Sequence, residues 1–141
     1  MDESSKKSIH VSAAIIVRQA QDGARQVFCT QRGYGDWKGW WEFPGGKIEA
    51  GESAQEALAR EIREELSAQI QVGGQVAVVE YDYPDFHLCM ECFEARVSAG
   101  ELKLLEHQSA AWLDAQNLRS VKWLPADQMI LDKVAELLAR G

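Results

Sequence analysis

The 141-residue sequence predicts a single α+β domain in which a mixed β-sheet lies between helices. The length suits one domain of ordinary size. The hydrophobic content of 46% is enough for a proper core, which excludes global disorder. Strand-like segments surround one helical pattern in the middle of the chain, and a second helical pattern ends it. The sequence contains no repeats and no linker-like stretch, so we expect residues 1–141 to form one domain, with residues 1–8 flexible.

Two strands and a glycine-rich loop are predicted in the first third of the chain. Residues 9–18 are rich in Val and Ile and predict a buried strand. The pair Asp22-Gly23 is typical of a hairpin turn, which leads into a second strand at 25–31. The loop that follows, GYGDWKGWWEFPGG, contains Trp37, Trp40 and Trp41, which suit either a base-stacking wall or loop packing.

The central helix has a clear start signal. Residues 53–66 have helical spacing, and Ser53 followed by Glu56 is a capping box.

The second half of the chain predicts three strands and a terminal helix. Two long strands are expected at 76–83 and 87–97, and a shorter one at 121–124. Residues 127–138 place their large apolar side chains on one stripe, which is typical of an amphipathic helix.

The net charge of −7 limits the classes of partner. An acidic chain repels a phosphate backbone, so we expect no duplex nucleic acid as partner, although a bound divalent cation would still allow a small anion to bind. No apolar run approaches the ~20 residues of a membrane span, and the start, MDESSKKS, lacks the apolar stretch of a signal peptide. We therefore expect a cytoplasmic protein without membrane contact. Monomer and homodimer both remain open.

Cysteine and histidine do not form a recognisable site in the sequence. Cys89 and Cys92 spell C-x-x-C, but they fall in a strand pattern where positions three apart face opposite ways, and no second pair exists. Ordinary buried thiols are therefore expected. Structural roles are expected for the isolated histidines, His10, His87 and His107.

A trio of carboxylates lies along the flank of the central helix. At about 100° per residue, Glu61, Glu64 and Glu65 fall beside the apolar stripe, whereas Arg60 falls on the opposite, solvent side. Glu61 and Glu65 repel each other as an i, i+4 pair, so simple surface pairing explains the trio poorly. Such carboxylates must be protonated, paired or bound to a cation, and oxygen ligands at this density suit Mg²⁺ or Mn²⁺. The pattern favours a metal site.

The residues around this helix fit a longer pattern. The segment Pro44-Gly45-Gly46-Lys47 precedes the helix, and glycines there let the backbone approach a metal or phosphate. Six positions match G-x5-E-x7-R-E-U-x-E-E-x-G-U, an agreement expected by chance on the order of once in 10⁵ sequences. They are Gly46, Glu52, Arg60, Glu61, Glu64 and Glu65.

This pattern resembles the signature of the Nudix hydrolases, which implies an α/β/α sandwich. Ser67 replaces the glycine of the motif, and Ala68 replaces its larger apolar residue. We expect Ser67 to lower the local stability by about 1 kcal/mol, and neither change removes a metal ligand. The likeness extends from residue 9 to residue 138. It includes WEFPGGKIEAGES, EYDYPD and the late Glu106, and it is similar to MutT-type nucleoside triphosphate pyrophosphohydrolases.

The resemblance implies roles for individual residues. Arg60 would orient a carboxylate of the helix, Glu52 would brace the loop, and Arg32 would meet a substrate phosphate. Tyr83 and Lys47 would also bind substrate. Metal ligands or the water-activating base would be the Gly45 carbonyl, Glu61, Glu64, Glu65 and Glu106. On position alone, without the family resemblance, an ordinary surface charge is the preferred explanation for both Glu106 and Arg32.

The resemblance implies Mg²⁺-dependent hydrolysis of a nucleoside triphosphate to a monophosphate and pyrophosphate. Two other roles stay open. One is cleavage of ADP-ribose or another nucleoside diphosphate sugar, for which Pro84 is a weak mark. The other is a non-catalytic nucleotide-binding domain, which the complete set of carboxylates disfavours.

The base is expected to contact Asp127, which aligns with an asparagine that contacts the purine in MutT. On position alone, a role as helix cap or partner of the helix dipole is slightly favoured over base contact. An ionised aspartate only accepts hydrogen bonds, which suits the exocyclic amino group of cytosine in CTP or dCTP. A buried, protonated Asp127 would instead mimic asparagine and admit 8-oxo-dGTP.

Overall fold

The computed structural model describes residues 7–104 and 109–140. Its sheet has the strand order β3-β2-β1-β6-β5, with β4 paired to β1 and β7 paired to β2. The strands are β1 (Lys7–Gln19), β2 (Arg25–Gln31), β3 (Trp41–Glu42), β4 (Gly45–Lys47), β5 (Ala68–Asp82), β6 (Phe86–Gly100) and β7 (Ser109–Leu113). β1 pairs in parallel with β6 and antiparallel with β2 and β4, so the sheet is mixed.

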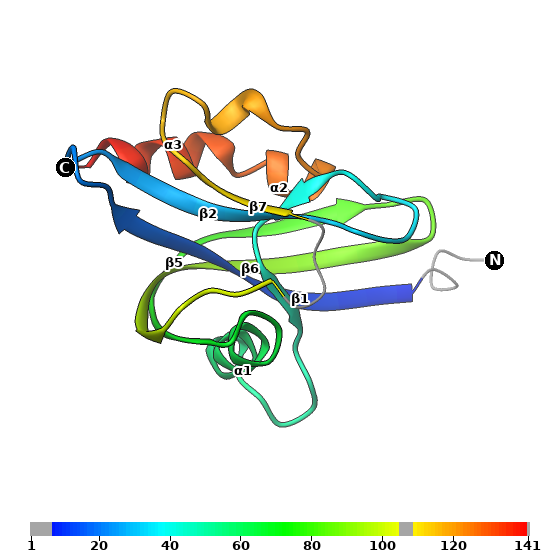
Figure 1. The fold of residues 1–141 in the computed structure, drawn as a ribbon. Coiled ribbons are helices and arrows are strands. Elements are labelled where there is room, and N and C mark those ends of the chain that lie inside the picture. The colour runs from blue at the N-terminus through cyan, green and yellow to red at the C-terminus, as the bar shows by residue number, and fades with distance from the viewer. Residues whose placement is uncertain (1–6, 105–108, 141) are drawn as a thin grey trace.

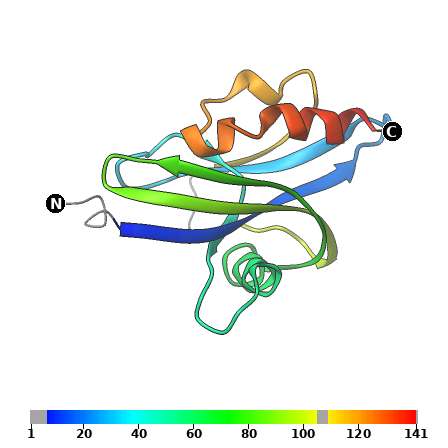
Figure 2. The same ribbon diagram turned by 180° about the vertical axis from the view of Figure 1, so that it is seen from behind.

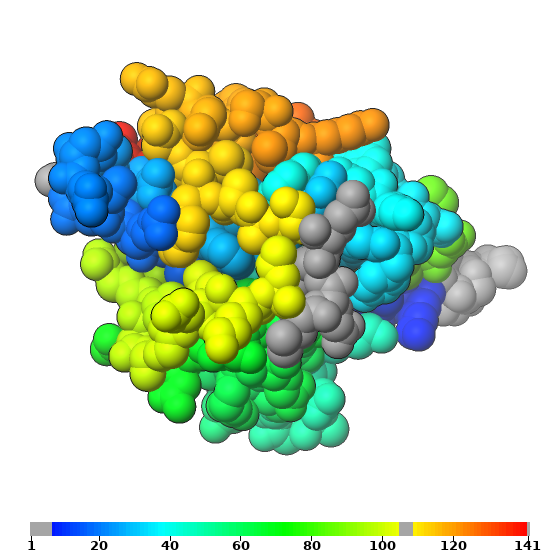
Figure 3. Space-filling model, viewed as in Figure 1, coloured from blue at the N-terminus to red at the C-terminus, as the bar shows by residue number. Residues whose placement is uncertain are grey.

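Helices cover both faces of this sheet. One face carries α1 (Ala54–Leu66); the other carries η2 (Leu118–Ser120), α2 (Pro125–Gln128) and α3 (Leu131–Ala139). Figure 1 and the reverse view in Figure 2 show α1 on one side of the strands and α2 and α3 on the other. In the space-filling view α1 forms the lower edge and the segment around η2 and α2 the upper edge (Figure 3). This is the expected α/β/α sandwich.

β1 is central because its side chains enter both halves of the core. Ala14 and Ile16 pack under α1, whereas Ile15 and Val17 pack on the side of α3. All residues from 13 to 17 are buried, which explains why this strand reads as a continuous apolar run rather than an alternating one.

Several predicted elements are confirmed. The strands predicted at 9–18 and 25–31 exist, and Ser53 caps α1 with both hydrogen bonds of the capping box. β5 and β6 are longer than predicted, and Lys7 and Ser8 belong to β1 instead of a flexible start. No helix of the described residues is long and apolar enough to cross a membrane.

The C-terminal third was predicted least well. Residues 121–124 are not a strand; they contribute a single bridge, between Trp123 and Trp41. The strand in this region is β7, which pairs antiparallel with β2, and the terminal helix is divided into α2 and α3. β7 reads SAAWL, so its small residues carry no alternating hydrophobic pattern, and its conformation depends on a partner strand far away in the sequence.

The cysteines are free thiols. Cys29 and Cys92 are buried in the core, where desolvation raises the pKa of each thiol to about 12. Cys89 is only partly buried, and its position three residues before Cys92 on β6 puts the two on opposite faces, so the C-x-x-C spacing brings no thiols together.

Candidate active site

Arg60 is the centre of the hydrogen-bond network on α1. Its Nε and Nη2 donate to the two carboxylate oxygens of Glu52 at 2.6 and 3.0 Å, and Nη1 donates to Glu61 at 3.1 Å and to Glu64 at 3.3 Å. Nη2 also donates to the carbonyl of Lys47 at 3.1 Å. These bonds raise the pKa of Arg60 and lower that of Glu52 to about 2. The guanidinium therefore joins α1 to the loop before it.

The direction expected for Arg60 is wrong, and so is the inference that ordinary pairing explains the carboxylate trio poorly. Arg60 does not project into solvent, because its side chain is only 17% exposed and curls over the loop. The carboxylate trio does have a cationic partner, since Arg60 holds Glu61 and Glu64. A helical wheel misses this because it ignores the length of an arginine side chain and the position of the preceding loop.

Two glycines allow a close approach between β4, β1 and α1. A Cβ on Gly46 would lie 2.3 Å from Cδ of Glu61, and a Cβ on Gly45 would lie 2.0 Å from the carbonyl oxygen of Ser12. The carboxylate of Glu61 therefore occupies the space that any larger residue at position 46 would need. The glycines predicted from the motif have a packing reason at both positions.

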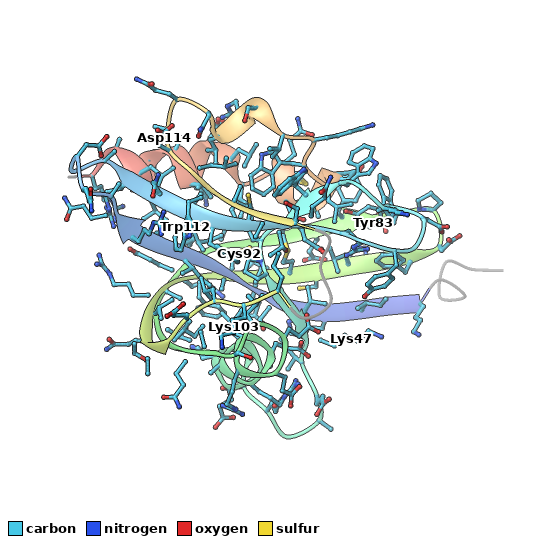
Figure 4. The ribbon with its side chains drawn as sticks, in the orientation of Figure 1. Lys47, Tyr83, Cys92, Lys103, Trp112 and Asp114 are labelled. Carbon is cyan, nitrogen blue, oxygen red and sulfur yellow. The ribbon has the colours of Figure 1, made fainter. Side chains whose placement is uncertain are left out.

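A cleft of about 510 Å³ opens beside these glycines. It is lined by acidic side chains that include Glu61 and Glu65, by the backbone of Gly45, and by the cationic side chains Arg32 and Lys47. Figure 4 shows Lys47 at this end of the sheet. Glu64 does not line the cleft and is 57% exposed, and Glu106 lies outside the described residues.

The oxygen donors in the cleft suit a hard cation in part. Glu61, Glu65 and the backbone of Gly45 are all oxygen ligands of the kind that Mg²⁺ prefers. Within residues 7–104 and 109–140, however, no group of three or more His, Cys, Asp or Glu side chains is arranged to hold a metal ion. In the described chain Arg60 holds two of the three helix carboxylates by hydrogen bonds.

A second, smaller cavity of about 160 Å³ continues from the cleft. Both spaces are lined by Val11, Arg32, Glu42, Gly45, Gly46, Phe86 and Leu88. The smaller cavity also has aromatic walls, Trp37, Phe43 and Tyr83, and Asp127 lines it as well. Trp40 and Trp41 do not line it, so only one of the three loop tryptophans has a place at the cavity.

Tyr83 and Phe86 are held in place at the turn between β5 and β6. Their rings stack with centroids 5.0 Å apart, and Trp37 meets Tyr83 edge-on at 5.6 Å. The Tyr83 hydroxyl accepts a hydrogen bond from the backbone N–H of Ala126 at 3.1 Å. This bond connects the turn that carries Tyr83 (Figure 4) to α2, the helix that contains Asp127.

Asp127 is a buried carboxyl group, only 4% exposed. Its Oδ2 accepts a hydrogen bond from the backbone N–H of Phe43 at 2.9 Å. Burial, with a smaller contribution from the charge of Glu42, raises its pKa from 3.8 to about 8, so the free protein keeps this group mostly neutral at pH 7. The side chain therefore reaches across to the residue that follows β3 and does not serve as the N-cap of α2, which is Leu124.

Arg32 forms an ion pair with Glu42 where the two spaces join. Its Nη2 and Nε donate to the two carboxylate oxygens at 2.7 and 3.2 Å. Glu42 was not singled out from the sequence, because a lone glutamate between Trp41 and Phe43 has no spacing signal. Its position opposite Thr30 on β2 brings it beside Arg32.

The two histidines of the described residues each have carboxylate neighbours. His10 lies 2.7 Å from a carboxylate oxygen of Glu91, and the ring nitrogens of His87 lie 2.8 and 2.9 Å from Asp82 and Glu80. His107 lies outside the described residues.

Known proteins share this sequence and this fold. The model of the NUDIX domain matches residues 8–140. The chain is 35% identical over 134 residues to the CTP pyrophosphohydrolase of Escherichia coli, covering 94% of this chain and 96% of that one. It is 32% identical over 96 residues to the 8-oxo-dGTP diphosphatase of the same organism, covering 68% and 74%. The solution structure of the E. coli ORF135 protein, 33% identical, superimposes with a TM-score of 0.78 over 99% of this chain and 96% of that one.

Proposed function

Because the chain belongs to the NUDIX domain family, a family of hydrolases that act on phosphoanhydride bonds, we propose that it hydrolyses a nucleoside triphosphate to the monophosphate and pyrophosphate, with cytosine nucleotides preferred. The observation that carries the proposal is the continuity of two spaces. An aromatic cavity lined by the mostly neutral carboxyl group of Asp127 shares lining residues with a cleft that contains both carboxylates and the cationic side chains of Arg32 and Lys47. The cavity suits a base and the cleft suits a triphosphate.

The residues of the cleft divide the chemical work. Glu61, Glu65 and the Gly45 carbonyl would hold Mg²⁺, joined by Glu64 and Glu106; the ion would neutralise phosphate charge and lower the pKa of the attacking water. Arg60 fixes the carboxylate of Glu61 by its 3.1 Å hydrogen bond, and Glu52 fixes Arg60 in turn.

Arg32 and Lys47 would face the phosphate groups. Arg32 has a guanidinium oriented by Glu42, and such a planar donor pairs well with phosphate oxygens. Water would attack a phosphorus atom of the triphosphate, and one carboxylate near the cleft would accept its proton.

The protonation state of Asp127 decides which base edge fits. A neutral carboxyl group presents one donor and one acceptor side by side, whereas an ionised one only accepts. The N3 atom of cytosine accepts a hydrogen bond and its N4 amino group donates one, so this edge is complementary to a neutral Asp127. The pKa of about 8 therefore changes the reason for a cytosine preference: the carboxyl group both donates and accepts.

8-oxo-dGTP is the second candidate, and the same carboxyl group favours it. The oxidised base carries a hydrogen on N7 beside the accepting O6, so it too presents a donor and an acceptor. Unmodified guanine presents two acceptors there and fits a neutral carboxyl group less well. The relative named 8-oxo-dGTP diphosphatase supports this candidate for the same site.

The substrate panel that tests the proposal contains CTP, dCTP, 5-methyl-dCTP, dGTP, 8-oxo-dGTP and ADP-ribose, with pyrophosphate or phosphate release measured with and without Mg²⁺. We expect kcat/KM to be highest for a cytosine nucleotide and activity to vanish without a divalent ion. Glu65→Gln should lower turnover by ~10³ with an intact fold. Preference for unmodified dGTP or ADP-ribose would overturn the assignment.

Two substitutions of Asp127 separate the neutral from the ionised form. Asparagine also donates and accepts, so Asp127→Asn should keep the substrate ranking at pH 6.5, whereas Asp127→Leu should lower kcat/KM for the preferred base by about 10–100-fold. If Asp127→Asn reverses the ranking at that pH, the carboxyl group acts in its ionised form and the argument from burial is wrong.

A further inference from the structure

A pocket lined by four arginines lies at the end of the molecule away from the candidate active site. It has a volume of about 320 Å³, and its lining residues are Val17, Arg18, Gln19, Arg25, Arg96 and Arg140. We call it the arginine pocket. None of its lining residues is acidic, although the whole chain carries a net charge of −7. A concentration of positive charge in an acidic protein requires a physical explanation.

The pocket is formed where chain segments distant in sequence meet. The end of β1, the start of β2 and the C-terminal end of α3 lie side by side in both ribbon views (Figures 1 and 2). Arg96 joins them from β6, since Ile16 of β1 is paired with Ala95, its neighbour in the sequence. The fold therefore brings the arginines together, and no spacing in the sequence reveals the cluster.

Two of the four guanidiniums are held by the protein. Arg25 is 14% exposed, and its Nη1 donates to the carbonyl oxygens of Leu137 and Arg140 at 2.7 and 3.0 Å. Arg18 lies 4.0 Å above the ring of Trp112, and its Nε donates to Oε1 of Gln26 at 2.8 Å. These contacts fix the positions of two cations, and Arg25 also offsets the negative end of the α3 dipole.

The other two guanidiniums lack acidic partners. Within residues 7–104 and 109–140, neither Arg96 nor Arg140 has a carboxylate within 4.0 Å. Among the described carboxylates, only Glu94 lies within 4.0 Å of any of the four guanidiniums, at 3.6 Å from Nη2 of Arg25. Among the described residues that line the pocket or form an ion pair with it, four arginines face one carboxylate, and a bound anion would neutralise this local excess.

From these contacts we propose that the arginine pocket binds a small anion with two or more phosphate groups. Guanidinium groups pair with phosphate oxygens through two parallel hydrogen bonds, which suits a cluster of arginines. The volume is near the lower limit of small-ligand pockets, about 300–1,000 Å³. A polynucleotide would meet the negative charge of the remaining surface, so a compact anion is favoured over a polymer.

This pocket is separate from the candidate active site. Val11 of β1 lines the cleft, and Arg18 of the same strand lines the arginine pocket. At the usual rise per residue of a β-strand, these two residues are about 20 Å apart along β1. Figure 4 shows the same separation, with Trp112 toward one end and Tyr83 and Lys47 toward the other. At physiological ionic strength charges are screened over about 8 Å, so the two sites can be tested independently.

The test measures binding of inorganic pyrophosphate by calorimetry in EDTA, without any divalent ion or catalysis. The variant Arg96→Gln/Arg140→Gln removes two exposed side chains, and we expect its Kd to be at least tenfold weaker. The control Arg63→Gln/Arg119→Gln removes the same charge from exposed positions outside the pocket, and its Kd should stay within twofold of wild type. Circular dichroism checks that both variants fold.

A second measurement locates the anion in the wild-type protein. In NMR titrations with pyrophosphate, the side-chain Nε–H signals of Arg25 and Arg96 should shift, and those of Arg63 should not. Several results would overturn the proposal: no binding up to about 10 mM pyrophosphate, equal loss in both double variants, or binding of a single-stranded oligonucleotide without binding of pyrophosphate. The double variant and the Nε–H signals report on the arginine pocket itself, and the test needs no turnover, so binding there and the proposed enzyme activity can each fail without the other.

Discussion

The buried carboxyl group of Asp127 should make the stability of the protein depend on pH. In the unfolded chain this group ionises near pH 3.8, whereas in the folded protein its pKa is about 8. Between these values unfolding releases a proton, so each added pH unit destabilises the folded state by about 1.4 kcal/mol. From pH 5 to pH 8 the contribution to the free energy of unfolding therefore falls by about 4 kcal/mol, and it changes little above that range.

Asp127→Asn removes this dependence without removing the hydrogen bond from Phe43, because the amide oxygen still accepts it. We expect the variant and wild type to be similarly stable near pH 5 and the variant to be more stable by about 4 kcal/mol at pH 8. Urea unfolding at several pH values measures the difference, and all other titrating groups cancel in it. Asp132→Asn, at an exposed position on α3, serves as control and should show a flat difference. A flat difference for Asp127→Asn as well would mean that Asp127 is ionised in the folded protein.

Three further substitutions test the geometry around α1. Arg60→Ala should lower turnover by about 10–100-fold, and Arg60→Lys should recover little of this activity because lysine lacks the planar guanidinium group. A fall in the urea midpoint of unfolding large enough to explain the whole loss of activity would contradict a positioning role for Arg60. Gly46→Ala should lower turnover by about 100-fold, since its Cβ would displace the Glu61 carboxylate. The control Gly74→Ala, where a Cβ meets no atom within 4 Å, should leave turnover unchanged. Equal effects of the two substitutions would show that the close approach at Gly46 is unimportant. Ser67→Gly should stabilise the protein by about 1 kcal/mol, because Ser67 ends α1 with a φ of 59°, a conformation that glycine adopts without strain. Denaturant unfolding measures the gain, and an unchanged free energy of unfolding would refute this explanation.

The parts of the site that were predictable are local in sequence. The capping box sets the start of α1, and the spacing of Glu61, Glu64 and Glu65 along that helix follows from its 3.6-residue period. The direction of Arg60 was mispredicted, because its hydrogen bonds run to Glu52 and Lys47 in the preceding loop. A helical wheel contains no information about where a loop returns.

Other features depend on pairing between distant strands. Glu42 meets Arg32 because β2 and β3 are antiparallel neighbours, and Asp127 meets the backbone of Phe43 across 84 residues of sequence. The second contact accompanies the burial of Asp127, and burial, with a smaller contribution from the charge of Glu42, changed its expected form from ionised to mostly neutral. Desolvation depends on the full surroundings of a group, which neighbouring residues in the chain do not reveal.

The sequence by itself therefore determined the family signature, the main strands and the helix with its carboxylates, because each of these is written in short-range spacing. The tertiary structure alone decided which charges are paired, which carboxyl group is neutral and where the arginines gather. Electrostatic interactions act through space between side chains that the fold brings together, so their outcome depends on distances and burial that exist only after the sheet has formed.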